Sequence, residues 1–323
     1  MIESSTRKPL ISRYRLKTRG FLNAISNRRE FEGALIEIDG GYGCIHPWPE
    51  LGDPTLEKCL ADLAGPQRWP IVRRAVRCAE FDRVARRFEN SLFEEMELPV
   101  SHATLAKGDA AEVAAAVEAG FTTAKLKCGR DPQTEAKFLE TMVAAYPIMN
   151  WRLDFNESLS AEQALEFLLG LSERARSAID FIEDPCPYAE SSWADLRAKT
   201  RLRLAVDREA APQSGAAQVM IIKPAVDEPF LLAEAAVLHG QRAVLTSYMD
   251  HPVGQAFAAW EAARLELQFP GLVGICGVQT HHLFEANEFT EALGPWSPEF
   301  HPPAGHGLGF DDQLAALPWT RLY

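Results

Sequence analysis

Charged residues recur along the middle of the chain, each near the end of a short apolar run. Lys125 and Lys127 stand two residues apart, so a strand would point both ammonium groups to one side. Asp154, Glu183 and Asp207 follow at intervals close to one strand-and-helix repeat. The carboxyl ends of parallel strands meet at one face of a barrel, where active sites lie. We therefore expect these five side chains to converge.

Three carboxylates at one site would repel one another, at about 4 kcal/mol for two charges 4 Å apart in a protein-like dielectric. A hard divalent cation with oxygen ligands removes this repulsion, and Mg²⁺ suits a site with few protein ligands. Lys127 and Lys223 could then act as acid/base or electrostatic groups beside a substrate on the metal. Any one carboxylate alone could be an ordinary solvated residue, but the ordered set argues against that reading.

The elements that must position these residues alternate between short apolar runs and helical stretches. Most of the intervening segments have helical spacing, among them 110–119, 161–173, 228–238 and 255–268. The apolar runs give eight candidate strands, and eight strands joined by crossover helices predict a (β/α) barrel. An open doubly wound sheet is the alternative, but residues 105–109 are not its glycine-rich phosphate turn. The candidate strands are 101–105, 123–128, 150–155, 179–183, 203–207, 218–222, 243–247 and 274–278.

The residues before about 95 predict a smaller α+β unit. Residues 11–19 alternate basic and apolar side chains, as a strand does. A second strand over 33–39 ends at the turn signal Gly40-Gly41, and helical spacing covers 55–64 and 68–92.

Composition narrows the function classes. The 323 residues are 47% hydrophobic and 24% charged, typical of a globular protein, and the net charge of −12 disfavours nucleic-acid binding. The six cysteines form no CxxC pair, which argues against a zinc site or a disulfide framework. The first residues lack the apolar core of a signal peptide, and no apolar run is long enough for a membrane span. We expect a cytoplasmic protein without a membrane or nucleic-acid partner; its oligomeric state stays open.

The charged segments, in chain order, are KLK (125–127), RLDFN (152–156), FIEDP (181–185), AVDRE (205–209) and IIKP (221–224). This order resembles the enolase superfamily, in its muconate-lactonizing-enzyme-like branch. The resemblance implies an α/β fold: a modified (β/α)₇β TIM-type barrel with an α+β capping domain built from N- and C-terminal segments. We expect a capping domain over 1–98, the barrel over 99–284, and a segment over 285–323 that returns to the cap.

The resemblance also implies roles for individual residues. It makes Asp154, Glu183 and Asp207 the Mg²⁺ ligands, with Lys127 and Lys223 as catalytic residues that face each other across a small carboxylate substrate. The expected substrate-binding residues are Lys125, Arg152, Asn156 and Ser247.

Within the superfamily, RLDFN, IEDPC (182–186) and GCIHPWPELGD (43–53) are most similar to the o-succinylbenzoate synthase family. That family dehydrates 2-succinyl-6-hydroxy-2,4-cyclohexadiene-1-carboxylate (SHCHC) to 2-succinylbenzoate in menaquinone biosynthesis. The similarity implies that Lys127 moves the proton and Lys223 stabilises an enediolate by its charge. The loop residues Leu22, Trp48 and Leu51 either close over the substrate or only pack.

Two other classes stay open. One is a racemase, dipeptide epimerase or cycloisomerase of the same superfamily that uses both lysines as bases; residues 277–281 lack the Asp-x-Asp of dipeptide epimerases, which counts against that member. The other is a silent barrel that only binds a partner, although a buried lysine–carboxylate cluster is costly to keep without a use.

Overall fold

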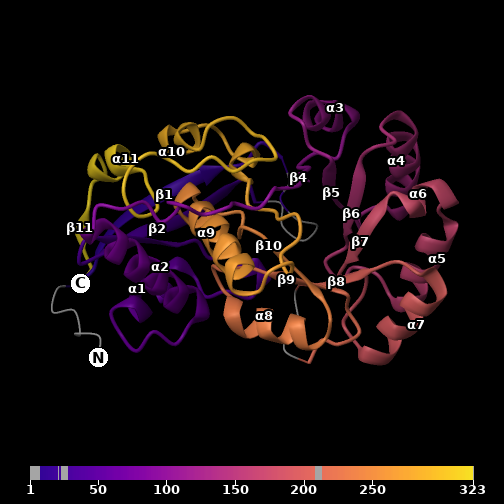
Figure 1. Ribbon diagram of the computed structural model, residues 1–323, viewed down its shortest axis with the longest axis horizontal. Helices are drawn as coiled ribbons and strands as arrows, with labels where there is room; N and C mark the ends of the chain where they lie inside the picture. The colour runs from indigo at the N-terminus through magenta and orange to yellow at the C-terminus, as the bar shows by residue number, and fades with distance from the viewer. Residues whose placement is uncertain (1–7, 21, 23–27, 208–212, 323) are drawn as a thin grey trace.

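The computed structural model describes residues 8–20, 22, 28–207 and 213–322. An antiparallel sheet with its helices occupies one side of Figure 1, and a parallel sheet surrounded by helices occupies the other. The first and the last of the described strands lie on the antiparallel side. The predicted fold class is confirmed: a capping α+β unit stands beside a (β/α) barrel.

The antiparallel sheet has the order β11-β1-β2-β3. Its β2–β3 hairpin turns through Asp39 and Gly40, whose φ angles of 51° and 85° are those of a tight two-residue turn. Gly41 and Gly43 lack the Cβ atoms that would collide with the backbone of the long second helix, so that helix packs closely on β3. The strands are β1 (Leu10–Lys17), β2 (Glu30–Ile38), β3 (Gly41–Ile45) and β11 (Thr320–Arg321).

Two helices, α1 (Leu56–Leu63) and α2 (Pro70–Arg87), and a short 3₁₀ turn, η1 (Pro49–Leu51), complete the N-terminal part of this unit. The helix expected over 68–92 starts at Pro70, because proline favours the first turn of a helix. The basic side chains of β1 point to solvent and pair with Glu57, Glu32 and Glu30, so this face of the sheet is solvated.

Seven parallel strands form the barrel sheet, in the order β10-β9-β8-β7-β6-β5-β4. Because the sequence order equals the spatial order, each strand returns to its neighbour through one crossover. The strands are β4 (Ala103–Thr104), β5 (Thr123–Lys127), β6 (Asn150–Asp154), β7 (Ile179–Glu183), β8 (Leu204–Val206), β9 (Val219–Ile222) and β10 (Arg242–Leu245).

Helices cover the outside of this sheet (Figure 1). The helix expected over 161–173 is two helices, because Ser172 starts a new one by accepting a hydrogen bond from Ala175 N. Between β8 and β9, residues 213–218 form turns without a helix, and 208–212 lie outside the described residues. The helices are α3 (Ala110–Glu118), α4 (Pro132–Ala145), α5 (Ala161–Gly170), α6 (Glu173–Ser177), α7 (Glu190–Thr200), α8 (Pro229–Leu238) and α9 (Pro252–Gln268).

The strand predicted over 274–278 is not formed as a continuous strand, which corrects that expectation. The segment makes isolated bridges instead, Ser101 with Cys276 on one side and Thr246 with Gly277 on the other. Cys276 N donates to Val100 O at 2.7 Å, and Gly277 N donates to Leu245 O at 2.8 Å. These bonds span the gap between β4 and β10 and close the barrel.

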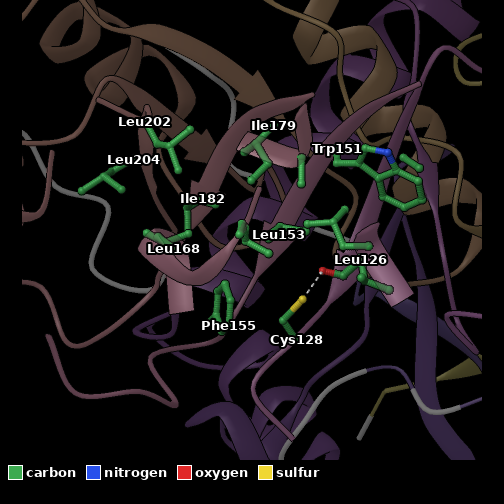
Figure 2. Packing of buried hydrophobic residues seen from close by; sticks show 14 of the residues in the cluster. Leu126, Cys128, Trp151, Leu153, Phe155, Leu168, Ile179, Ile182, Leu202 and Leu204 are labelled. Carbon is green, nitrogen blue, oxygen red and sulfur yellow. Dashed lines mark hydrogen bonds between the residues drawn. The ribbon is translucent and has the colours of Figure 1, made fainter. Parts of the chain in front are cut away.

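Alternate residues of the barrel strands point outward and inward. The outward side chains, such as Leu126, Trp151 and Leu153, pack under the helices in the cluster of Figure 2. Inside the barrel, Phe181 lies among small and branched apolar side chains that include Ile221. The charged residues predicted to carry the chemistry occupy the next inward positions toward the carboxyl ends of the strands.

The C-terminal segment returns to the N-terminal unit, in yellow in Figure 1. It contains η2 (His281–Leu283), α10 (Glu288–Ala292) and α11 (Asp311–Ala315). Buried Asp82 of α2 accepts hydrogen bonds from Tyr42 N and Leu308 N, and so fastens the segment to the cap. No helix among the described residues is both long enough and apolar enough to cross a membrane.

Candidate active site

Lys125 lies between two carboxylates at the carboxyl ends of β6 and β7. Its Nζ donates to Glu183 Oε1 at 2.6 Å and lies 2.9 Å from Asp154 Oδ2. Lys127, the next inward residue of β5, forms a second ion pair with Asp154. Because Asp154 and Glu183 are direct partners in the β6–β7 register, the four side chains form one cluster at the strand ends.

The next two strands extend this cluster. Asp207 directly follows β8, Lys223 directly follows β9, and their side chains form an ion pair. Since β8 lies between β7 and β9, the three carboxylates follow one another around the barrel, with Lys127 on one flank and Lys223 on the other. The structure thus brings together the five side chains that the sequence led us to expect at one place, and Lys223 joins them as the sixth.

Burial and charge set the proton affinities in this cluster. Burial raises the pKa of Glu183 to about 7, and the nearby negative charge of Asp154 adds to the effect. Burial also opposes the ionised form of Asp154, but the charges of Lys125 and Lys127 outweigh it and hold that pKa well below the usual range. For Lys223, burial is outweighed by Asp207 and Glu183, so its pKa is raised. Each carboxylate is thus partly neutralised by a lysine.

Comparison with known proteins identifies the family. Residues 9–85 match the O-succinylbenzoate synthase N-terminal domain, and residues 108–227 match the enolase C-terminal domain-like family. The sequence is 31% identical to o-succinylbenzoate synthase of Bdellovibrio bacteriovorus, over 96% of this chain and 97% of that protein. The chain belongs to the o-succinylbenzoate synthase family. The protein of that name from Aliivibrio salmonicida is 29% identical over 75% of this chain and 82% of its own length.

Solved structures agree with this o-succinylbenzoate synthase family fold. The N-succinyl Arg/Lys racemase from Bacillus cereus superposes with a TM-score of 0.79 at 18% identity, over 98% of this chain and all of that one (100%). The muconate lactonizing enzyme from Pseudomonas fluorescens gives 0.78 at 17% identity, over 96% and 98%. At such identities the likeness establishes the shared architecture alone, a cap beside a barrel.

The donor set of this family member fits a hard divalent cation. Asp154, Glu183 and Asp207 offer carboxylate oxygens from three adjacent strands, and Glu183 Oε2 is buried without a hydrogen-bond partner. As the described side chains stand, no three His, Cys, Asp or Glu residues are grouped to hold an ion. Instead the carboxylates are turned toward the lysines. Enolase-superfamily sites use a lysine or histidine base with Mg²⁺, which is consistent with this donor set.

Two neighbouring residues hold Asp154 and Asp207 in place, one through a carboxylate and the other through the backbone. Asn156, expected to bind substrate, donates to Asp154 Oδ1 from its backbone N at 3.1 Å and from Nδ2 at 2.6 Å. Asp184, for which the sequence suggested no role, accepts a hydrogen bond of 3.0 Å from Asp207 N. Both residues have positive φ, 48° and 41°, in turns that directly follow the strand ends. The Glu-Asp-Pro motif was the available signal for Asp184.

Arg152 does not fit the substrate-binding role expected for it. It is fully buried (0% exposed), and its Nε donates to Asp180 Oδ2 at 2.9 Å. Its Nη1 lies 2.7 Å from His102 Nδ1 and donates to Ile275 O at 2.8 Å. Asp180 reaches it because the β6–β7 register shifts there by one residue. Arg152 therefore supports the barrel interior one layer below Asp154.

Two other expected substrate contacts are also occupied by protein groups. Lys125 is held by its carboxylates, and the Ser247 hydroxyl lies 2.6 Å from Thr280 Oγ1, with Ser247 only 4% exposed. Another residue beside the cluster, Tyr248, was not expected from the sequence; its ring lies 5.9 Å from Lys223 Nζ. No local pattern marks Tyr248, because its partners come from the N-terminal unit.

Tyr248 also contacts a loop residue that the sequence singled out. Trp48 is fully buried, its Nε1 donates to Tyr248 O at 3.0 Å, and its backbone N donates to Asp53 Oδ2 at 2.8 Å. Leu22 is buried and Leu51 is half-buried in the same apolar cluster. The 46–54 loop therefore packs against the barrel loop that follows β10.

Proposed function

We propose that this member of the o-succinylbenzoate synthase family is an Mg²⁺-dependent dehydratase that converts SHCHC to 2-succinylbenzoate through an enediolate, as in menaquinone biosynthesis. The observation that carries the proposal is the arc of Asp154, Glu183 and Asp207 with lysines on its two flanks. The 31% identity to a whole-length o-succinylbenzoate synthase supports the choice of substrate.

In this proposal Asp154, Glu183 and Asp207 hold the cation, which supplies positive charge where the substrate carboxylate gains electron density. Lys127, in its neutral form, removes the proton from the carbon next to the carboxylate. The same Lys127 ammonium then gives that proton to the leaving hydroxyl, which departs as water as the ring becomes aromatic. Proton count is conserved, so one acid/base group suffices.

Lys223 has a different role in this proposal. It stays protonated, as its raised pKa favours, and its charge stabilises the negative charge that develops on the substrate. Lys125 stays between Asp154 and Glu183, where it keeps two adjacent carboxylates from repelling each other.

A second candidate reaction is racemisation of an N-acylamino acid. The specific observation in its favour is that the lysines lie on opposite flanks of the arc, as two opposed bases would. The absence of an Asp-x-Asp in 277–281 still counts against a dipeptide epimerase.

The division into a cap over 1–98, a barrel over 99–284 and a returning segment over 285–323 belongs to the same proposal. Pairing of β11 with β1, and of Asp311 with Arg86, supports the return of the last segment to the cap. We also propose that the partner is a small carboxylate rather than a macromolecule.

The experiment incubates the purified protein with SHCHC and Mg²⁺ and follows loss of the diene absorbance, with product identified by mass. Lys127→Met should abolish the signal, whereas Lys199→Met, at an exposed lysine on α7, should not. Racemisation of N-succinyl amino acids with higher catalytic efficiency than dehydration of SHCHC would replace this proposal by the second candidate. If the protein converts neither SHCHC nor an N-succinyl amino acid, both candidate functions are refuted.

A further inference from the structure

Arg74 projects from α2 of the N-terminal unit toward the helices and the turn at the outside of the barrel. Its side chain is only 6% exposed, and its nitrogens reach different barrel elements. Nε donates to Pro224 O at 2.9 Å, and Nη2 donates to Glu261 Oε1 of α9 at 2.7 Å. A longer contact of 3.4 Å joins Nη1 to Glu228 Oε2. One guanidinium thus connects α2, the turn after β9 and α9.

The turn that Arg74 holds begins at Lys223. Lys223 O accepts hydrogen bonds from Val226 N at 2.9 Å and Asp227 N at 2.8 Å, and Lys223 N donates to Asp227 Oδ2 at 2.6 Å. These bonds make residues 223–227 a compact unit. The bond from Arg74 to Pro224 O, next to Lys223 itself, ties this unit to α2.

The far anchor of Arg74 is rigid. Glu261 is fully buried, and its second oxygen is held by Arg264 at 3.0 Å from Nε and 2.7 Å from Nη2. The Arg74 guanidinium also lies 5.5 Å from the ring centre of Phe257 on α9. A planar fork can satisfy Pro224 and Glu261 together, whereas the single nitrogen of a lysine side chain cannot do so in the same geometry.

We propose that Arg74 is a positioning residue that sets the place of the Lys223 backbone, so that the N-terminal unit controls the alignment of one of the two lysines. The proposal rests on the proposed function only in taking Lys223 as catalytic. The ammonium of Lys223 is attached to the turn by a four-carbon side chain. A shift of the turn therefore changes the positions that the ammonium can reach. A displacement of about 1 Å at a reacting group can cost about a hundredfold in rate.

The test compares Arg74→Lys with Arg86→Lys. Arg86 is a matched control because it lies on the same helix and is also part-buried, but it pairs with Asp82 and Asp311 of the cap rather than with the barrel. Hydrogen–deuterium exchange followed by mass spectrometry reports the amides of 219–228 without any need for substrate. We expect exchange there to accelerate about tenfold in Arg74→Lys, the effect of losing one net hydrogen bond, and to stay unchanged in Arg86→Lys.

Kinetics with SHCHC form the second readout. We expect Arg74→Lys to lower kcat by about tenfold to a hundredfold with KM within about twofold, and Arg86→Lys to change neither. Glu261→Gln, which keeps the shape of the anchor, should fall between them. Unchanged exchange at 219–228 in Arg74→Lys, or equal acceleration in Arg86→Lys, overturns the inference. Wild-type protein that does not dehydrate SHCHC overturns the proposed function instead, and the exchange result still decides the role of Arg74 in holding the turn.

Discussion

The hydroxyl of Tyr248 donates a hydrogen bond of 3.0 Å to Asp53 Oδ2, across the junction between the capping unit and the barrel. The same Tyr248 ring lies 5.9 Å from Lys223 Nζ, within the range of a cation–π contact. The pKa of Asp53 is raised by burial, and the hydrogen bonds from Trp48 N and Tyr248 offset only part of this rise. The cap loop is thus connected through one side chain to a lysine of the candidate site.

Tyr248→Phe tests this connection, because it keeps the ring over Lys223 and removes only the bond to Asp53. We expect KM to rise about threefold to tenfold, the value of one net hydrogen bond, with a smaller change in kcat. Steady-state kinetics measure both. Tyr146→Phe, at the end of α4, is the control and should leave KM unchanged. An unaltered KM in Tyr248→Phe would show that the contact does not help to form the substrate site.

The metal ligands are tested by substitutions that keep shape. Asp154→Asn, Glu183→Gln and Asp207→Asn each replace a charged oxygen ligand, and we expect each to lower kcat about a thousandfold or more. Chelation by EDTA should abolish activity, and added Mg²⁺ should restore it. Asp195→Asn, at an exposed position of α7, is the control. Full activity in excess EDTA contradicts the metal-dependent mechanism.

The two flanking lysines should differ. Lys127→Arg keeps a positive charge but removes a group that can act as a base, because guanidinium stays protonated. We expect it to lose both dehydration and exchange of the substrate α-proton with deuterated solvent. Lys223→Arg keeps its cation and should retain part of both activities. Proton NMR of the substrate in D₂O measures the exchange, and wild-type exchange in Lys127→Arg would show that Lys127 is not the base.

Acid should destabilise the fold through buried neutral histidines. Burial lowers the pKa of His282 to about 3, and its Nε2 lies 2.9 Å from Thr104 O. The unfolded chain binds a proton at this residue below about pH 6.5 whereas the folded protein does not, so stability is lost as pH falls from there toward 3.

The free energy of unfolding changes with pH, and its slope between about pH 6 and pH 4 should be smaller in His282→Gln than in the wild-type protein. The expected difference in slope is about 1.4 kcal/mol per pH unit. Urea denaturation at a series of pH values measures this slope. His301→Gln is the control, since His301 is exposed. An unchanged slope in His282→Gln would mean that His282 titrates alike in the folded and unfolded protein.

The cluster itself could be predicted from the sequence because it depends on local periodicity. Lys125 and Lys127 are two residues apart on one strand, so they share its inward face. Asp154 and Glu183 end neighbouring parallel strands, so they meet once the strand order is known. Both inferences need only the two-residue repeat of strands and the shared direction of barrel strands.

The sequence could not predict how deep inside the barrel each inward side chain lies. Arg152 has the same inward parity as Asp154 but lies one layer lower, where the irregular register at Asp180 supplies its partner. Contacts such as Tyr248 with Asp53 join residues far apart in the chain and leave no local pattern. The segment 274–278 looks like a strand by composition, yet Gly277 is needed there to leave room for the ring of His102. It closes the barrel by isolated bridges.

Pairing of β11 with β1 bears on how the chain folds as it is made. Leu10 and Ile11 are bonded opposite Arg321 and Thr320, which a ribosome adds only after the whole barrel has been translated. Until then that edge of β1 has backbone groups without their final partners, and such edges invite pairing with other chains. The capping sheet is therefore completed last, and the nascent chain must keep its first strand from pairing elsewhere while the barrel assembles beside it.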